Sequence, residues 1–67
     1  MSLVQKFGQN VKRERIAKGL SQDELAVQAN MRRSYLSDLE RGTRNPSIQV
    51  LGRLAAALGI EPSDLLR

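Results

Sequence analysis

Four of the chain's arginines gather in the stretch from residue 32 to residue 44. They are Arg32, Arg33, Arg41 and Arg44. The same stretch carries two acidic residues, Asp38 and Glu40, which leaves it a net charge of +2. A guanidinium group is a planar fork of donors that matches phosphate oxygens or the O6 and N7 atoms of guanine. The stretch therefore indicates either a polyanionic partner such as nucleic acid or a basic surface that is simply solvated.

The composition of the whole chain supports a binding protein and argues against an enzyme. Its 67 residues include 11 Lys and Arg against 7 Asp and Glu, a net charge of +4, with no Cys and no His. The lack of Cys and His excludes zinc fingers, redox motifs and the usual pairs of nucleophile and base. We expect no catalytic residue, no metal site, no cofactor and no small-molecule ligand.

The length and the hydropathy pattern predict one domain, residues 1–67, in the cytoplasm. The longest nearly apolar run, Leu54 to Ile60, is far shorter than the roughly 18 residues of a membrane span. We therefore expect no membrane partner. A domain of this size without disulfide or metal usually needs close helix packing or oligomerisation.

Hydrophobic spacing predicts the first helix, and it ends at Gly19 because glycine readily caps a helix in the left-handed conformation. Its apolar stripe is Val4, Phe7, Val11 and Ile16. A second helix begins at Ser21, which forms a capping-box pattern with Glu24. Its inward residues are Leu25, Ala26 and Ala29.

A third helix, about Arg33 to Arg41, follows after a turn in which Asn30 takes a left-handed conformation. Leu36 and Leu39 lie on its buried side, and Gly42 ends it. Two short helices joined by a tight turn indicate a helix-turn-helix, with its core at residues 22–41.

Two further segments complete an all-α bundle of four to five short helices. Ser47 is the expected N-cap of a fourth helix that runs to Leu58 and stops at Gly59. Its inward residues are Ile48, Leu51, Leu54, Ala55 and Leu58. Pro62 suits the first position of a short fifth segment, expected to end at Arg67.

Several linked motifs resemble the phage repressor and Cro-type helix-turn-helix family, especially restriction-modification controller proteins. They are Leu20-Ser21-Gln22-Asp23-Glu24-Leu25-Ala26, then Ser34-Tyr35-Leu36-Ser37-Asp38-Leu39-Glu40-Arg41-Gly42, then Asn45-Pro46-Ser47. The resemblance runs from about Phe7 to Leu66. It implies a lambda-repressor-like bundle whose third helix recognises DNA, and a transcription regulator, repressor or autoregulatory controller.

The resemblance also implies which residues contact DNA. The expected base contacts are Arg32, Arg33, Ser34, Ser37 and Asp38, and the expected backbone contacts are Gln22, Tyr35, Arg41, Thr43, Arg44 and Asn45. Asp38 either accepts from cytosine N4 or holds Arg33 or Arg41 in place, and its poor match to phosphate favours the second role. Arg15 and Glu40 match a structural ion pair of the family.

The sequence departs from the family pattern at two positions. Arg32 stands where relatives commonly cap the third helix with Ser or Thr, so this cap should be missing, at a cost of about 1 kcal/mol. Asn30 replaces the glycine that is usual in the turn. Asparagine tolerates the left-handed conformation that this position requires.

We expect a homodimer, at least on DNA, that binds a near-palindromic operator. The expected dimer contacts are Ile60, Leu65 and Leu66, which are apolar and close to the end of the chain. Two alternatives stay open: a protein-interaction module that kept the fold, or the DNA-binding head of a larger sensor regulator. RNA or single-strand binding is disfavoured, because Phe7 and Tyr35 are the only aromatic residues available for stacking.

Overall fold

The computed structural model describes the whole chain and contains four α-helices and one short 3-10 helix. They are α1 (Leu3–Ala17), α2 (Gln22–Gln28), α3 (Arg33–Arg41), α4 (Ile48–Leu58) and the 3-10 helix η1 (Pro62–Leu65). These bounds confirm the predicted helices. The expected end of the fifth segment at Arg67 is wrong, because η1 stops at Leu65. Helices of the 3-10 type rarely extend beyond about four residues.

Serine side chains mark the beginnings of three helices. The hydroxyl groups of Ser2, Ser21 and Ser47 accept hydrogen bonds from backbone N–H groups three residues further on. Ser2 and Ser21 belong to full capping boxes. Arg32, at the start of α3, makes no such bond, as its side chain has no acceptor. Three helices therefore have a capped start, and α3 does not.

Left-handed residues mark the ends of the four α-helices. Gly19, Gly42 and Gly59 have φ angles of 71°, 76° and 70°, and Asn30 has a φ of 56°. Asparagine adopts this conformation with less strain than most residues that carry a side chain. The turn between α2 and α3 therefore forms without the glycine that is usual in it.

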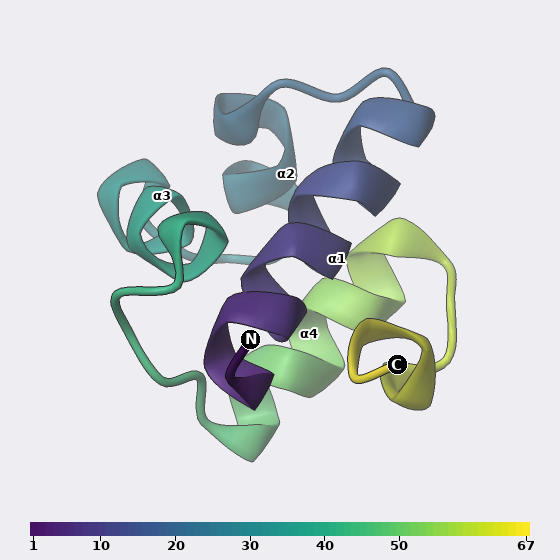
Figure 1. Cartoon of the computed structure of the whole chain (residues 1–67). Helices are drawn as coiled ribbons and strands as arrows, with labels where there is room; N and C mark the ends of the chain where they lie inside the picture. The colour runs from purple at the N-terminus through teal and green to yellow at the C-terminus, as the bar shows by residue number, and fades with distance from the viewer.

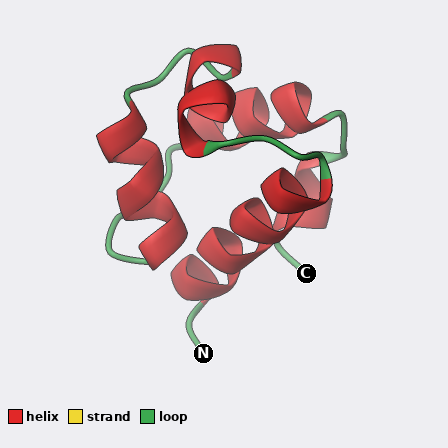
Figure 2. Cartoon of the chain, turned by 90° about the horizontal axis from the view of Figure 1, so that it is seen from above, coloured by secondary structure: helices red, strands yellow, loops and turns green.

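The long helix α1 is the element around which the others pack. It contacts α3, α4 and η1, while α2 packs against α3 and α4. Figure 1 shows α3 on one side of α1, with the C-terminal segment on the other, and both termini at the same end of the molecule. Figure 2 shows helices and loops but no strand. None of the helices is long and apolar enough to cross a membrane.

One cluster of buried apolar side chains holds these helices together. Its members are Phe7, Val11, Leu25, Ala26, Ala29, Leu36, Leu39, Val50, Leu54, Ala55, Leu58 and Leu65. Burying a leucine or phenylalanine contributes about 1.5–3 kcal/mol relative to leaving it in water. Every helix places at least one residue in this cluster, so each of them gains from the packing of the others.

Two residues expected in the core are exposed. Ile16 is 58% exposed, because it lies five residues after Val11, and at about 100° per residue this turns it well away from the Phe7–Val11 stripe. Ile48 is 86% exposed. It keeps the spacing of the α4 stripe but stands in the first turn of the helix, where no other element covers it.

Candidate nucleic-acid interface

Helices α2 and α3 form the helix-turn-helix that the sequence predicted. Ala26 of α2 is only 2% exposed and belongs to the core cluster, and α2 packs against α3. Met31, in the turn, packs half-buried against the core. The N–H of Met31 donates to the carbonyl oxygen of Ala26 at 2.9 Å, and this bond fixes how the chain leaves α2.

The capping box at Ser21 gives α2 a charged N-terminal turn. The backbone N–H of Ser21 donates to Glu24 Oε1 at 2.8 Å, and the N–H of Glu24 donates to the Ser21 hydroxyl at 3.0 Å. These bonds with Ser21 hold the pKa of the Glu24 carboxyl below its usual value. The carboxylate remains ionised, where the helix dipole favours negative charge.

The five expected base-contact residues lie at the beginning and along one side of α3. Arg32, Arg33 and Ser34 are exposed, while Ser37 and Asp38 are half-buried. Arg33 Nε lies 3.5 Å from Asp23 Oδ1, and both side chains are largely in solvent. A pair this exposed is weak and screened by salt, so Arg33 can leave it for another partner.

A second charged group joins the end of α3 to the loop that follows it. Asp38 Oδ1 accepts a hydrogen bond from Arg41 Nη2, and Asp38 Oδ2 lies 3.7 Å from Arg44 Nη2. The guanidinium of Arg44 stands over the ring of Tyr35, 5.2 Å from its centroid. Thr43 lies in the same loop. The structure therefore brings the expected backbone contacts Tyr35, Arg41, Thr43 and Arg44 into one neighbourhood.

The predicted ion pair between α1 and α3 is present and largely buried. Arg15 donates from Nε to Glu40 Oε2 at 2.7 Å and from Nη2 to Glu40 Oε1 at 3.0 Å. Only 11% of the Arg15 side chain and 3% of the Glu40 side chain are exposed. The hydrogen bond with Glu40 raises the pKa of Arg15 against the opposing effect of burial, and the carboxylate charge raises it further.

Gln22 belongs to the same buried junction. Its Nε2 donates to Glu40 Oε1 at 3.0 Å. The third nitrogen of the Arg15 fork, Nη1, donates to the carbonyl oxygen of Leu20 at 2.9 Å. The side chain expected to contact a DNA phosphate is thus engaged within the protein. Glu40 links α1, α2 and α3 through a single carboxylate.

Comparison with known proteins decides the family. Residues 11–65 match the family described as Helix-turn-helix. The chain belongs to the helix-turn-helix family. It is 46% identical over 61 residues to Control protein C.BamHI of Bacillus amyloliquefaciens, across 90% of this chain and 75% of that protein.

Two solved helix-turn-helix structures are similar in fold and sequence. The restriction-modification controller protein C.AhdI of Aeromonas hydrophila is 48% identical, with a TM-score of 0.90 over 92% of this chain and 94% of that one. SinR, a master regulator for biofilm formation solved in complex with DNA, is 44% identical, with a TM-score of 0.87 over 91% of this chain and 98% of that one. The chain is a DNA-binding transcription regulator and not an enzyme.

Sequence reasoning missed two residues of α1 that fix its packing, Gly8 against α3 and Asn10 against the C-terminal segment. A Cβ atom on Gly8 would lie 2.2 Å from the carbonyl oxygen of Leu39, so glycine is required for α1 to cross α3 this closely. Asn10 is 2% exposed, and its Nδ2 donates to the carbonyl oxygens of Leu65 and Arg67 at 2.9 and 3.0 Å. The signal was available, since both residues lie beside the Phe7–Val11 stripe.

The three residues expected at a dimer interface lie in different surroundings. Leu65 is fully buried, and its assignment to an interface is wrong, because η1 turns this side chain into the core. Ile60 is half-buried against the core. Leu66 is 40% exposed. Only Leu66 offers substantial apolar surface to a partner.

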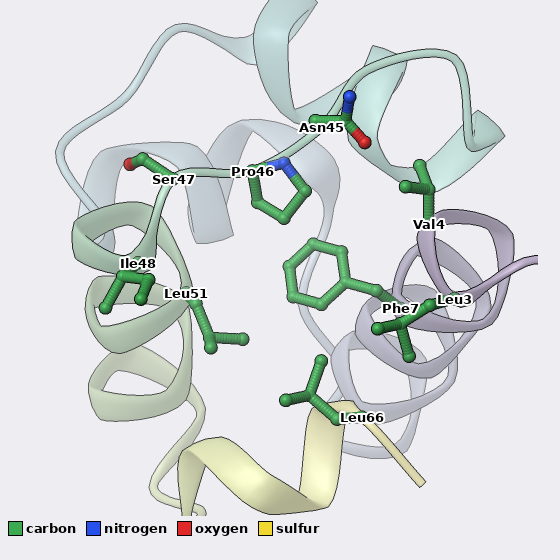
Figure 3. A pocket seen from close by; sticks show the side chains of 9 residues that line it. All are labelled: Leu3, Val4, Phe7, Asn45, Pro46, Ser47, Ile48, Leu51 and Leu66. Atoms are coloured by element: carbon green, nitrogen blue, oxygen red, sulfur yellow. The ribbon is translucent and has the colours of Figure 1, made fainter.

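An apolar groove lies beside Leu66, between the beginnings of α1 and α4 (Figure 3). Its lining residues are Leu3, Val4, Phe7, Asn45, Pro46, Ser47, Ile48, Leu51 and Leu66, none of them charged. Leu3 and Ile48 are 60% and 86% exposed. Asn45, expected to contact the DNA backbone, is exposed and lines this groove, and no side-chain bond joins it to Asp38.

Proposed function

We propose that the chain binds a near-palindromic operator as a homodimer and represses transcription or controls its own expression. In this proposal α3 enters the major groove and Arg33 and Ser34 contact base edges. The observation that carries it is the placement of Arg32, Arg33 and Ser34, all exposed at the beginning of α3. Residues in this position of a helix-turn-helix are the ones that reach base edges.

Arg33 suits sequence recognition because its present partner is weak. The distance of 3.5 Å to the exposed carboxylate of Asp23 describes an ion pair that contributes little to stability. A bidentate contact with guanine is worth about 1–3 kcal/mol of discrimination. Exchanging the Asp23 pair for a base contact is therefore favourable on the correct sequence.

The apolar groove supports the dimer in this proposal. Monomeric proteins seldom leave a contiguous apolar patch uncovered, and an interface with twofold symmetry uses the same patch on both copies. Leu3, Ile48 and Leu66 give such a patch without charge. Two copies would present their α3 helices to successive major grooves about 34 Å apart.

Selection of bound duplexes from a randomised library tests the recognition. At roughly physiological salt, where nonspecific phosphate contacts are weakened, we expect an inverted repeat to be enriched. Arg33→Ala should relax the preference at one base pair in each half-site, and Arg44→Ala should weaken binding to all sequences alike. Identical shifts in preference for the two variants would contradict this division of roles.

Sedimentation tests the dimer. We expect Ile48→Glu to shift the chain toward monomer and to weaken operator binding, because a charge placed in a closed apolar interface must be desolvated. Ile16→Glu is the matched control, since Ile16 is also exposed but lies outside both the groove and the helix-turn-helix. A wild-type chain that remains monomeric at high concentration and on DNA would refute the dimer.

A further inference from the structure

Asp38 stands between two arginines that the proposed function directs toward DNA phosphates. Its Oδ1 accepts from Arg41 Nη2, and its Oδ2 lies 3.7 Å from Arg44 Nη2. Arg41 and Arg44 keep 63% and 54% of their side-chain surface exposed, against 29% for Asp38. The cations are therefore accessible to a ligand, while the carboxylate lies beneath them.

Bonds from the loop after α3 fix the backbone at Asp38. The backbone N–H and the hydroxyl of Thr43 both donate to the carbonyl oxygen of Asp38 at 3.1 Å. Arg41 Nη1 also donates to the Ser37 hydroxyl at 3.3 Å. On the other side, the Tyr35 ring lies under Arg44. Both guanidinium groups thus have a second partner that helps to hold them beside Asp38.

We infer that Asp38 is a positioning and specificity-determining residue, which holds Arg41 and Arg44 in place and suppresses binding to DNA of the wrong sequence. This inference rests on the proposed DNA contacts of the two arginines. The carboxylate reduces the net charge of the three side chains from +2 to +1. Because affinity for DNA at random sites comes almost entirely from phosphate neutralisation, this loss of one charge weakens nonspecific binding directly.

Binding to the correct sequence suffers less from the same carboxylate. In that complex the two arginines meet fixed phosphates, and a donor already held in position loses less conformational entropy when it binds. Exposed ion pairs contribute only about 0–1 kcal/mol, so a phosphate oxygen can take over one of the donors of each arginine. Asp38 therefore lowers nonspecific affinity more than operator affinity.

The salt dependence of DNA binding tests this inference. Wild type, Asp38→Asn and Asp38→Ala are titrated with the selected operator and with a random-sequence duplex of equal length, between about 50 and 200 mM salt. For both variants we expect the slope of log K against log salt on the random duplex to become steeper by about 0.9. Near 0.15 M salt this corresponds to about fivefold tighter nonspecific binding.

The ratio of operator affinity to nonspecific affinity gives the second readout. Affinity for the operator should rise by less than affinity for the random duplex, so the ratio falls in both variants. Glu14→Gln is the matched control, because it removes one negative charge from α1 at a side chain that makes no ion pair. It should leave the ratio unchanged. A purely structural role of Asp38 would not alter the salt slope.

Two outcomes would overturn the inference. Unchanged slopes and an unchanged ratio in both Asp38 variants would show that the carboxylate does not act on the arginines. Loss of operator binding with unchanged nonspecific binding would instead identify Asp38 as a base contact, accepting from cytosine N4. If the wild-type chain binds neither duplex, the proposed function itself is refuted. This result is distinct from the two above.

Discussion

Glu40 and Asp38 lie two residues apart on α3 and both pair with arginine, in opposite surroundings. Glu40 is 3% exposed at the side chain and joins Arg15 and Gln22 in the junction of three helices. Asp38 is 29% exposed and meets two arginines that extend into solvent. The comparison shows that burial decides the role of a pair between a carboxylate and an arginine. A buried pair is a permanent part of the fold, whereas the arginine of an exposed pair can bind a ligand instead.

The energetic reason is the cost of removing charge from water. A buried carboxylate that loses its partner cannot regain solvent, so breaking such a pair is strongly destabilising. An exposed pair is close in energy to its two hydrated ions. Glu40 should therefore influence stability and Asp38 should influence binding. Variants of the two residues separate the effect on stability from the effect on binding.

The largest expected effect comes from Glu40→Ala. Removing this carboxylate leaves Arg15 largely buried and unpaired, which should cost about 3 kcal/mol of the free energy of unfolding. Urea unfolding followed by circular dichroism measures it. For so short a chain this is a large part of the total stability.

A double variant sharpens this result. Arg15→Met with Glu40→Leu replaces both charges by apolar side chains of similar length, and we expect it to recover most of the lost stability. If Glu40→Ala alone changes the free energy of unfolding by less than about 1 kcal/mol, the junction is not behaving as a buried ion pair.

Gln22→Ala should have an intermediate effect. The hydrogen bond from Gln22 Nε2 reaches a charged and buried acceptor, and bonds of this kind contribute about 1.5–3 kcal/mol. Gln28→Ala is the matched control on the same helix, since Gln28 is exposed and should cost less than about 0.5 kcal/mol. Equal and small losses in both would mean that Gln22 contributes nothing to this junction and is available for DNA.

Asp38→Asn should leave stability almost unchanged. Its two arginine partners are more than half exposed, so the free energy of unfolding should move by less than about 0.5 kcal/mol. Thermal unfolding at low and high salt measures this. A loss of more than about 1 kcal/mol would place Asp38 with Glu40 among the residues that hold the fold together.

The smallest expected effect is the contribution of Glu24 to the pH dependence of stability. Because its pKa is lowered in the folded protein by its bonds with Ser21, the carboxylate adds stability that is present above the unfolded pKa of about 4.3. That stability is lost as pH falls through the lower, folded value. Unfolding measured between neutral pH and about pH 3 should show a smaller acid loss in Glu24→Gln than in wild type. Equal acid losses would contradict the assignment.

Much of the fold was predictable because its signals are local. A serine N-cap, a glycine or asparagine stop and a stripe of apolar residues each depend on a few neighbouring positions. Ser21, Ser47, Gly42 and Asn30 therefore gave the correct helix boundaries. The Arg15–Glu40 pair was also correct, but it came from resemblance to a family and not from local rules.

Two of the errors occurred where tertiary neighbours decide the outcome. Ile48 has the spacing of a core residue and is exposed, because nothing packs over the first turn of α4. Leu65 stands near the end of the chain and is buried, because η1 folds back onto α1, where Asn10 binds its carbonyl oxygen. Hydrophobic spacing shows which residues share a face of a helix but not whether another helix covers that face.

The sequence by itself determined the helical class, the helix-turn-helix and the stretch of arginines that directs it toward DNA. Those features follow from residue type and spacing along the chain. Only the tertiary structure decided which charges are available for binding. It placed Gln22 on Glu40 and Asp38 between Arg41 and Arg44, since the strength of each pair depends on the water that the surrounding helices exclude.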